Sequence, residues 1–359
     1  MSETPSEPAE TPFAQTDFEQ ITTLVSGGFQ IEEALLEHNI PTYYLKQPQE
    51  TKQAFLALLK KLETMNFIAI LRMQDGRIVL KIIPKLPIKR SNVLINWLLF
   101  FATIGTTFIT GYLLSEGLID PVIGGATYAI AIMAVAGIHE MGHKLTANKE
   151  GIDATPPYFI PGPPPTLGGF GTFGAVIIQK SLPANKDKLF DIGSSGPIFG
   201  FIIATIVTAV GMTMLIPAAS VQEATYLPMP LLSILIYELM SSFGMVPSPS
   251  PGQDLFMHPV ALAGWLGMII TMLNLLPAAM LDGGHIARSL AGEKTRTVLM
   301  VISILLLIIS GFWLMVVFVL FLAMQKHPGP LDDVSSLSTN RKLLAILLVA
   351  IFILVFPLF

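Results

Sequence analysis

The chain contains no cysteine, and charged residues are scarce: Asp, Glu, Lys and Arg make up 13% of its 359 residues. The missing cysteine excludes disulfide bonds and thiolate metal ligands. The low charge, together with a hydrophobic content of 52%, excludes an ordinary soluble globular protein and is typical of a polytopic membrane protein. From Asp191 to Ala287 there is no Lys or Arg, and nothing in the charge distribution suggests nucleic-acid binding.

The amino-terminal part differs in composition from the rest. Residues 1–16 are rich in Pro, Glu, Ser and Thr and lack the apolar stretch of a signal peptide, which predicts a disordered tail. Residues 17–90 are expected to form a small cytoplasmic α/β accessory domain without a catalytic constellation, with a regulatory, docking or structural role. Its expected elements are an amphipathic helix over Thr51–Met65, strands over Phe67–Arg72 and Arg77–Ile83, and a further short strand over Thr42–Leu45.

Six apolar stretches follow, each close to the roughly 20 residues that a membrane-spanning helix needs. They are Val93–Leu114, Val122–Leu145, Ile192–Ile216, Pro259–Leu276, Val298–Met324 and Leu343–Phe359. The expected fold class is an all-α polytopic membrane protein of about six transmembrane helices, with a β or re-entrant segment after the second helix. Leu231–Phe243 is left open as an interfacial helix or a further short insertion.

Basic residues indicate the orientation of these stretches. Lys85, Lys89 and Arg90 precede the first stretch, so the positive-inside rule predicts a multi-pass protein with its amino terminus in the cytoplasm. The loops after the second and fourth stretches then face the cytoplasm, and both are rich in Lys and Arg. The opposite loops, Ser115–Pro121 and Pro217–His258, contain neither.

A metal-binding pattern lies at the end of the second stretch. In His139-Glu140-Met141-Gly142-His143 the two histidines are spaced i and i+4, so both imidazoles lie on one face of a helix and can bind one zinc ion. Glu140 can act as general base toward a water that the metal activates. Ionisable groups within an apolar span are costly, which favours function over a chance match.

Catalytic zinc usually has three protein ligands, and Asp282 is the best candidate for the third. The predicted topology brings it to the same membrane face as the two histidines. Pro277 is expected to interrupt the helix before it, and Gly283-Gly284 to end that helix. His285 could also bind the metal, but it ranks below Asp282 as a ligand. The expected site is one Zn²⁺ per chain, held by His139, His143 and Asp282.

With both motifs in view, the chain resembles the site-2 protease family of intramembrane zinc metalloproteases. The resemblance covers roughly Val122 to Arg296 and rests on His-Glu-x-x-His, the segment Gly193–Gly200, and Asn274-Leu-Leu-Pro-x-x-x-Leu-Asp282-Gly-Gly, which is similar to the archaeal, cyanobacterial and plastid branch. It implies His139, His143 and Asp282 as zinc ligands and Glu140 as catalytic acid/base. It also implies regulated intramembrane proteolysis of transmembrane protein substrates. The expected partners are thus such a substrate and membrane lipid, and no nucleic acid. Position 285 is His where relatives often have Arg, and no PDZ-like domain is seen.

Together, the apolar stretches and the resemblance divide the chain into residues 91–121 as first transmembrane helix, 122–297 as catalytic core and 298–359 as carboxy-terminal transmembrane helices. The distribution of basic residues predicts that the active site opens towards the cytoplasm. Asn274 is a candidate catalytic residue that stabilises an oxyanion or bound substrate; an interhelical hydrogen bond is an equal alternative. The oligomeric state is left open.

The loop after the second stretch is the candidate substrate-binding segment. Pro156–Pro165 cannot be helical, and Phe170–Gln179 is expected to form one or two strands. One hypothesis is that this strand pairs with an unwound substrate through Phe173, Ala175, Val176 and Ile177. The alternative is a plain re-entrant or interfacial loop.

Two other function classes use the same ligands. A zinc transporter or metal sensor would need ionisable residues in several spans, and outside the two motifs the spans have almost none. A receptor or scaffold with a degenerate metal site would not need Glu140 beside the histidines.

Overall fold

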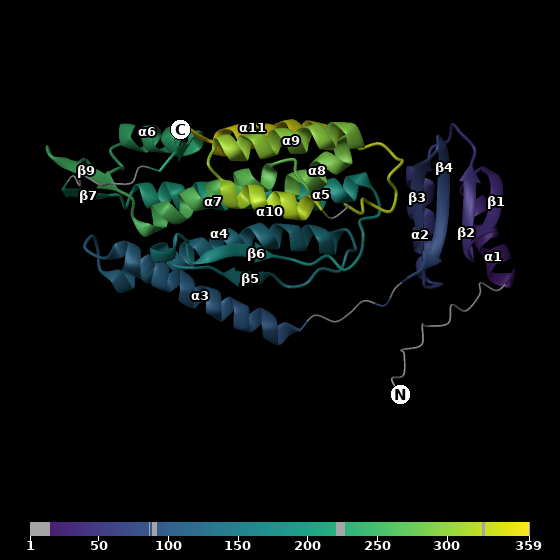
Figure 1. Cartoon of the computed structure of the whole chain (residues 1–359), viewed down its shortest axis with the longest axis horizontal. Helices are drawn as coiled ribbons and strands as arrows, with labels where there is room; N and C mark the ends of the chain where they lie inside the picture. Colours follow the sequence, from purple (N-terminus) through teal and green to yellow (C-terminus); the bar gives the residue numbers. More distant parts are fainter. Residues whose placement is uncertain (1–14, 86, 88–91, 220–226, 325–326, 359) are drawn as a thin grey trace. The chain divides into compact units, whose positions relative to one another are not determined.

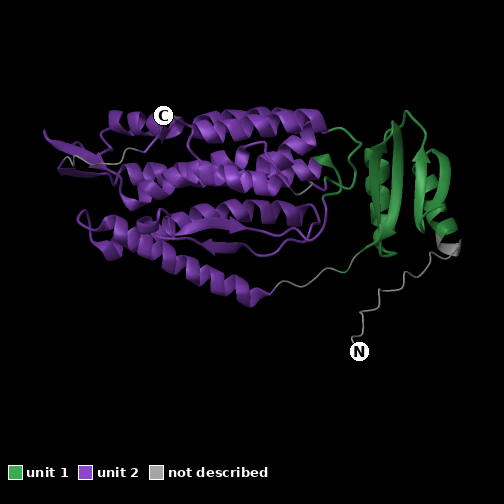
Figure 2. Cartoon of the chain, in the orientation of Figure 1, with its two compact units in different colours: residues 1–88, 183–186, 329–336 green, residues 89–182, 187–328, 337–359 purple. Residues whose placement is uncertain are grey.

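The computed structural model describes residues 15–85, 87, 92–219, 227–324 and 327–358 (Figure 1). Most of the expected tail lies outside the described residues, as do Lys89 and Arg90. The chain divides into two compact units (Figure 2). Unit 1 comprises Met1–Ile88, Pro183–Lys186 and Gly329–Ser336, and unit 2 comprises Lys89–Leu182, Asp187–Pro328 and Leu337–Phe359.

Unit 1 is built on a four-stranded antiparallel sheet in the order β1-β2-β4-β3. Its elements are α1 (Gln15–Ser26), β1 (Ile31–Glu37), β2 (Ile40–Leu45), α2 (Lys52–Glu63), β3 (Phe67–Gln74) and β4 (Arg77–Pro84). The helix and the three strands expected from the sequence are confirmed. The sequence did not indicate β1, whose Ile-Glu-Glu-Ala-Leu-Leu-Glu carries three glutamates, a residue with low β propensity. It did not indicate α1 either, which begins inside the expected tail.

Two segments from much later in the chain complete unit 1. Leu71 of β3 pairs in parallel with Asp332, and Asp332 pairs in parallel with Asn185. Segment 329–336 therefore lies along β3, and segment 183–186 lies along segment 329–336. Nothing in the sequence pointed to these pairings, because they join stretches more than a hundred residues apart.

Unit 2 is helical. Its helices are α3 (Val93–Ser115), α4 (Pro121–Lys149), α5 (Lys186–Met212), α6 (Leu231–Ser242), α7 (Pro259–Leu275), α8 (Asp282–Leu290), α9 (Glu293–Ile309), α10 (Trp313–Ala323) and α11 (Thr339–Val355). Among the described residues, α3, α4 and α5 are long and apolar enough to cross a membrane. They correspond to the first three expected spans, while the full count of six is not confirmed.

The fifth expected span, Val298–Met324, is wrong as a single helix. The chain forms α9 and α10 instead, because Gly311 between them has a φ of 73°, a left-handed conformation that turns the chain and that glycine adopts without strain. With 11 residues, α10 is about 16 Å long, well short of a bilayer's hydrocarbon core. The stretch left open in the sequence, Leu231–Phe243, forms the 12-residue helix α6.

The expected strand after α4 is confirmed as part of a small antiparallel pair, β5 (Tyr158–Pro161) with β6 (Thr172–Val176). A short 3₁₀ turn, Pro165–Leu167, lies between the two strands. The other small pairs were not anticipated: β7 (Ile216–Ala219) with β9 (Gln253–Phe256), and β8 (Met229–Pro230) with β10 (Pro357–Leu358).

Helices α4, α5 and α7 pack around one apolar core, which contains Tyr128, Ile132, Trp265 and Met268 among its buried side chains. The same packing holds α4 against α7, and α7 contacts α8, which follows it in the chain. The core therefore fixes the helices that carry the candidate site.

The β5–β6 hairpin is held to this bundle through its backbone. The Asn96 Nδ2 donates to the carbonyl oxygen of Pro156 (3.2 Å), and the Thr106 hydroxyl donates to that of Gly171 (2.7 Å), both from α3. The Tyr128 hydroxyl of α4 donates to the carbonyl oxygen of Phe170 (2.9 Å). Side chains of α3 and α4 thus satisfy loop carbonyls that an apolar surrounding would leave without partners.

Candidate metal centre

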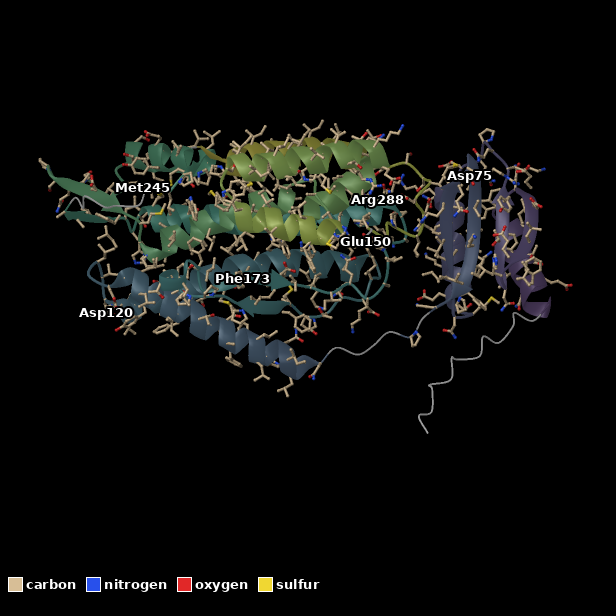
Figure 3. The ribbon with its side chains drawn as sticks, viewed as in Figure 1. Asp75, Asp120, Glu150, Phe173, Met245 and Arg288 are labelled. Atoms are coloured by element: carbon tan, nitrogen blue, oxygen red, sulfur yellow. The ribbon has the colours of Figure 1, made fainter. Side chains whose placement is uncertain are left out.

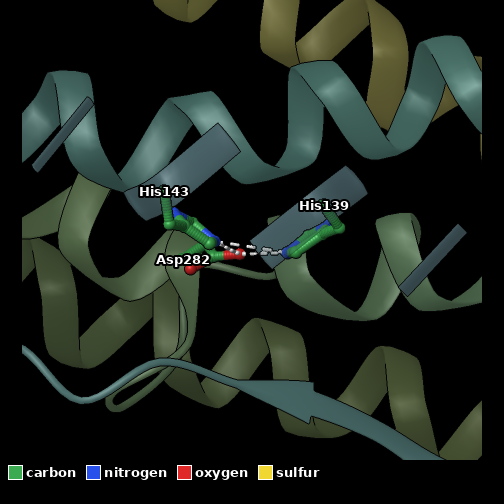
Figure 4. Close-up of side chains that lie close together, drawn as sticks. All are labelled: His139, His143 and Asp282. Carbon is green, nitrogen blue, oxygen red and sulfur yellow. Dashed lines mark hydrogen bonds and ion pairs between the residues drawn. The ribbon is translucent and has the colours of Figure 1, made fainter. Parts of the chain in front are cut away.

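Three side chains from two helices converge inside unit 2 (Figure 4). The Asp282 Oδ2 lies 3.2 Å from the His139 Nε2 and 3.2 Å from the His143 Nε2, and the two Nε2 atoms are 3.3 Å apart. Both histidines are buried, and Asp282 is half-buried. The structure thus brings together the three residues that the sequence indicated.

This donor set fits a zinc ion. Zinc bonds of about 2.0–2.2 Å in a tetrahedron place neighbouring ligand atoms roughly 3.3–3.5 Å apart. The three measured separations are close to that spacing, so the atoms lie as one face of a tetrahedron and leave the fourth corner open. Two imidazole nitrogens and one carboxylate oxygen are also ligand types that zinc accepts.

Backbone geometry positions the ligands. The His143 Nδ1 bonds to the carbonyl oxygen of Ile192 on α5 at 2.7 Å, so Nδ1 carries the proton and Nε2 is left as the metal-binding atom. Asp282 is the first residue of α8, where the positive end of the helix dipole favours a carboxylate. The sequence expectation that Pro277 breaks the helix is confirmed, since α7 ends at Leu275. Gly283 and Gly284 do not end a helix but lie inside α8, where each approaches backbone carbonyls too closely for a side chain.

Helix α5 can approach the two histidines because it presents glycines to them. A methyl group at Gly196 would overlap the His143 ring, and one at Gly200 would lie 2.6 Å from the His139 Nδ1. Any larger residue at either position would push a metal ligand away. Small residues in apolar helices commonly allow close packing, and here Gly196 and Gly200 let α5 pack against the two metal-binding histidines.

Glu140 lies next to the three ligands. Its Oε1 is 4.0 Å from the His139 Nε2, and the side chain is buried. The backbone of Ile177, just after β6, interacts with this carboxylate. The candidate general base is therefore close both to the metal donors and to the candidate substrate-binding hairpin.

Asn274, near the end of α7, also reaches the centre. Its Nδ2 lies 3.3 Å from the His139 Nε2, so it contacts a metal ligand. This contact agrees with either alternative from the sequence: a donor at the reaction site or a bond between helices α7 and α4.

His285 does not join the three donors. Its Nδ1 lies 2.7 Å from the Nε2 of His327, and the two rings are edge-to-face. The sequence gave no sign of this second imidazole pair, because His327 follows α10 and belongs to no motif.

The candidate substrate-binding residues lie on β6 and just after it. Phe173, labelled in Figure 3, lies on β6. It is 62% exposed and Val176 45% exposed, while Ala175 and Ile177 are half-buried. Of these four, Ile177 is the residue whose backbone lies near the Glu140 carboxylate.

Comparison with known proteins agrees with this geometry. The profile of Peptidase family M50 matches residues 127–318, just over half of the chain. The "Probable zinc metalloprotease EGY2, chloroplastic" of Arabidopsis thaliana is 30% identical over 220 residues, covering 58% of this chain and 37% of that protein. The "Probable zinc metalloprotease EGY1, chloroplastic" of Oryza sativa subsp. japonica is 30% identical over 236 residues, covering 64% of this chain and 40% of that protein.

Among solved structures, the Site-2 Protease from Methanocaldococcus jannaschii aligns with 62% of this chain and 85% of its own, at 18% identity and a TM-score of 0.29. That score is too low to support an argument about fold.

The match to the family profile contains the complete His-Glu-x-x-His pattern and Asp282, and the chain belongs to peptidase family M50. It spans about two fifths of the length of the curated relatives it matches.

Proposed function

We propose that the chain is an intramembrane zinc metalloprotease, which hydrolyses peptide bonds within or near the transmembrane segments of other membrane proteins. The observation that carries this proposal is the donor triangle of His139, His143 and Asp282 with Glu140 beside it. The two histidines and the glutamate lie on α4, which is long and apolar enough to cross a membrane. His139, His143 and Asp282 hold the metal, and Glu140 moves protons.

Zinc, when bound, supplies a Lewis acid that polarises the scissile carbonyl and makes a water easier to deprotonate. The Glu140 carboxylate accepts the proton of the attacking water and delivers it to the nitrogen of the leaving amine. One carboxylate can serve both steps, because it is protonated after the first and regenerated by the second. Its burial keeps bulk water from competing for that proton.

Asn274 is assigned to the reaction site. Its Nδ2 lies on the His139 side of the donor triangle, where it can donate to the carbonyl oxygen of a bound peptide as negative charge develops there. The competing assignment, a bond that only joins α7 to α4, predicts a different mutant phenotype, described in the Discussion.

The β5–β6 hairpin is assigned to substrate binding through Phe173, Ala175, Val176 and Ile177. A transmembrane helix hides its peptide bonds, so a substrate must be extended before it can be cut. A strand next to the general base can offer main-chain hydrogen bonds to such an extended segment. The nearness of the Ile177 backbone to the Glu140 carboxylate supports this assignment, because it brings the end of the hairpin beside the general base.

The protein is further assigned as multi-pass, with its amino terminus and the opening of the active site towards the cytoplasm. This rests on the Lys and Arg of the loops after the second and fourth expected spans and on their absence from the opposite loops.

A zinc transporter or sensor remains the alternative class. The same three ligands would serve it, but Glu140 would have no necessary role. The two classes therefore differ in what a change at Glu140 does.

The deciding experiment compares the wild type with Glu140→Gln, using purified protein, a model single-span substrate, and zinc content measured on both. We expect equal zinc in both proteins, and a loss of cleavage of about 10²- to 10⁴-fold in the variant, because general acid–base catalysis contributes that much. Equal zinc without cleavage by either protein would favour transport or sensing. A wild type that holds no zinc would refute the three-ligand site.

A further inference from the structure

The amino-terminal ends of α5 and α11 are joined by a partly buried ion cluster in unit 2. The Arg341 Nε donates to the Asp191 Oδ1 at 2.7 Å, and a second nitrogen of the same guanidinium donates to the other Asp191 oxygen. The remaining terminal nitrogen donates to Asp187 at 3.1 Å and to the Ser338 hydroxyl at 2.8 Å. A guanidinium bound by two carboxylates, one of them bidentately, is a strong and directional arrangement.

This cluster lies one turn before the part of α5 that touches the metal ligands. Asp191 is followed directly by Ile192, whose carbonyl oxygen fixes the His143 Nδ1, and then by Gly196, which packs on the His143 ring. A shift of the first turns of α5 would thus move the partner that sets the tautomer and orientation of His143. The family profile matches residues 127–318, and Arg341 lies outside that range. The ion cluster therefore includes a residue that the family match does not cover.

The chain just before each end of the cluster belongs to unit 1. Segment 183–186 leads into Asp187, and segment 329–336 leads into Ser338 and Arg341. Within unit 1 these segments are bonded to each other, from the Leu331 N–H to the Pro183 oxygen (2.8 Å) and from the Asp332 N–H to the Ala184 oxygen (2.9 Å).

Segment 329–336 is also bonded to the sheet. The Leu71 N–H of β3 donates to the Leu331 oxygen (2.9 Å), and the Asp333 N–H donates to the Leu71 oxygen (3.1 Å). An Arg72 side-chain nitrogen donates to the same Leu331 oxygen at 2.7 Å. The Asp332 carboxylate closes the turn that follows by accepting the Val334 and Ser335 N–H groups, each at 2.9 Å. The segment therefore has a defined conformation within unit 1.

The other end of segment 329–336 is anchored as well. His327 precedes it and bonds to His285, which lies on the same helix as the metal-binding Asp282. Residues 327–341 thus contact three elements in order. The first is α8, which carries the metal-binding Asp282. The second is β3 of unit 1, and the third is α5, whose backbone orients His143.

We propose that Arg341 is a positioning residue, which through Asp191 and Asp187 holds the first turns of α5 and with them the carbonyl that orients a metal ligand. Segment 329–336, which leads directly into α11, is the strap that fixes where that helix and its Arg341 begin. The proposal rests on zinc as the ion of the proposed function. It accounts for the ion cluster and for the backbone pairings of the segment that leads into α11.

The test measures zinc affinity of the full-length protein in detergent by chelator competition, together with hydrogen exchange of the backbone over residues 187–196. The variants are Arg341→Gln and a strap variant in which residues 330–335 are replaced by Gly and Ser at equal length. Arg77→Gln is the matched control, since it removes a guanidinium from the exposed pair with Glu33 in unit 1. Neither readout needs proteolysis, so failure of the proposed protease activity in the wild type would be seen separately.

We expect both variants to bind zinc about tenfold more weakly than Arg77→Gln, as is typical when the partners that orient metal ligands are lost, and to exchange faster over 187–196. Arg341→Lys, which keeps the charge but loses the bidentate contact, should fall between, and it gives the answer if Arg341→Gln does not fold. If Arg341→Gln and Arg341→Lys lower thermal stability but match the control in zinc affinity, the cluster is only structural and the proposal is overturned. If only the Arg341 variants weaken zinc binding, the role of segment 329–336 is overturned.

Discussion

At the scale of single residues, the metal centre depends as much on missing side chains as on the ligands. The ligand types and their spacing could be predicted from the sequence, because His-x-x-x-His on a helix leaves few alternatives. The carbonyl of Ile192 could not, because every residue has such an oxygen and only the packing of α5 selects this one. Gly196 is the residue that allows this packing.

Gly196→Ala should therefore damage the metal centre directly. The added methyl would overlap the His143 ring, and α5 or the ring must move, so we expect zinc affinity to fall by about 100-fold, measured by chelator competition. Gly105→Ala is the matched control, since a methyl at that helical glycine of α3 meets no atom within 4 Å among the described residues. Equal zinc affinity in the two variants would show that α5 does not hold the ligands in place.

Asn274→Ala separates the two roles of that residue. If Asn274 donates to the developing oxyanion, kcat should fall by about 10²- to 10³-fold while zinc content is unchanged. Parallel measurement of zinc content, thermal stability and cleavage decides the matter. A variant that loses stability but keeps its kcat would assign Asn274 to helix packing alone.

At the scale of elements, the sequence predicted whether a stretch is helix or strand better than it predicted where each element begins and ends. Apolar length identified α3, α4 and α5, but it joined α9 and α10, because a run of apolar residues does not reveal that one glycine inside it adopts a positive φ. Strand β6 was expected within Phe170–Gln179, but its partner β5 lies in the proline-rich stretch that was expected only to be non-helical. The strands β7 and β9 were missed because each has only four residues, too few for a periodic signal.

The hairpin makes a prediction at this scale. If it binds substrate through its main chain, Val176→Pro should lower kcat/KM by about tenfold, since proline removes an N–H and prevents a strand-like bond. Val176→Ala removes most of the side chain and keeps the amide, so it should cleave at nearly the wild-type rate. Equal activity of the proline and alanine variants would contradict strand pairing at this position. The two are compared on the same single-span substrate.

At the scale of the whole molecule, the two units differ in composition, but neither of them is one continuous stretch of the chain. Composition set the amino-terminal domain apart at about residue 90, because charged and apolar stretches differ there. It could not show that residues 183–186 and 329–336 belong to that domain, since backbone pairing between distant segments leaves no mark in either one. The absence of cysteine, which excluded thiolate ligands, also makes the orientation of the molecule directly measurable.

Single cysteines at two exposed positions test that orientation: Asp75→Cys in the turn between β3 and β4, and Ser248→Cys between α6 and β9. With no native thiol, all labelling by a membrane-impermeant maleimide reports the introduced residue. Because basic residues favour the cytoplasmic side, Asp75→Cys should be labelled in inside-out vesicles and protected in right-side-out ones, with the reverse for Ser248→Cys. Labelling of both in the same vesicles would place the turn of unit 1 and the α6–β9 loop on one side. The proposed orientation would then be wrong, and an opening of the metal centre towards the cytoplasm would have to be given up with it.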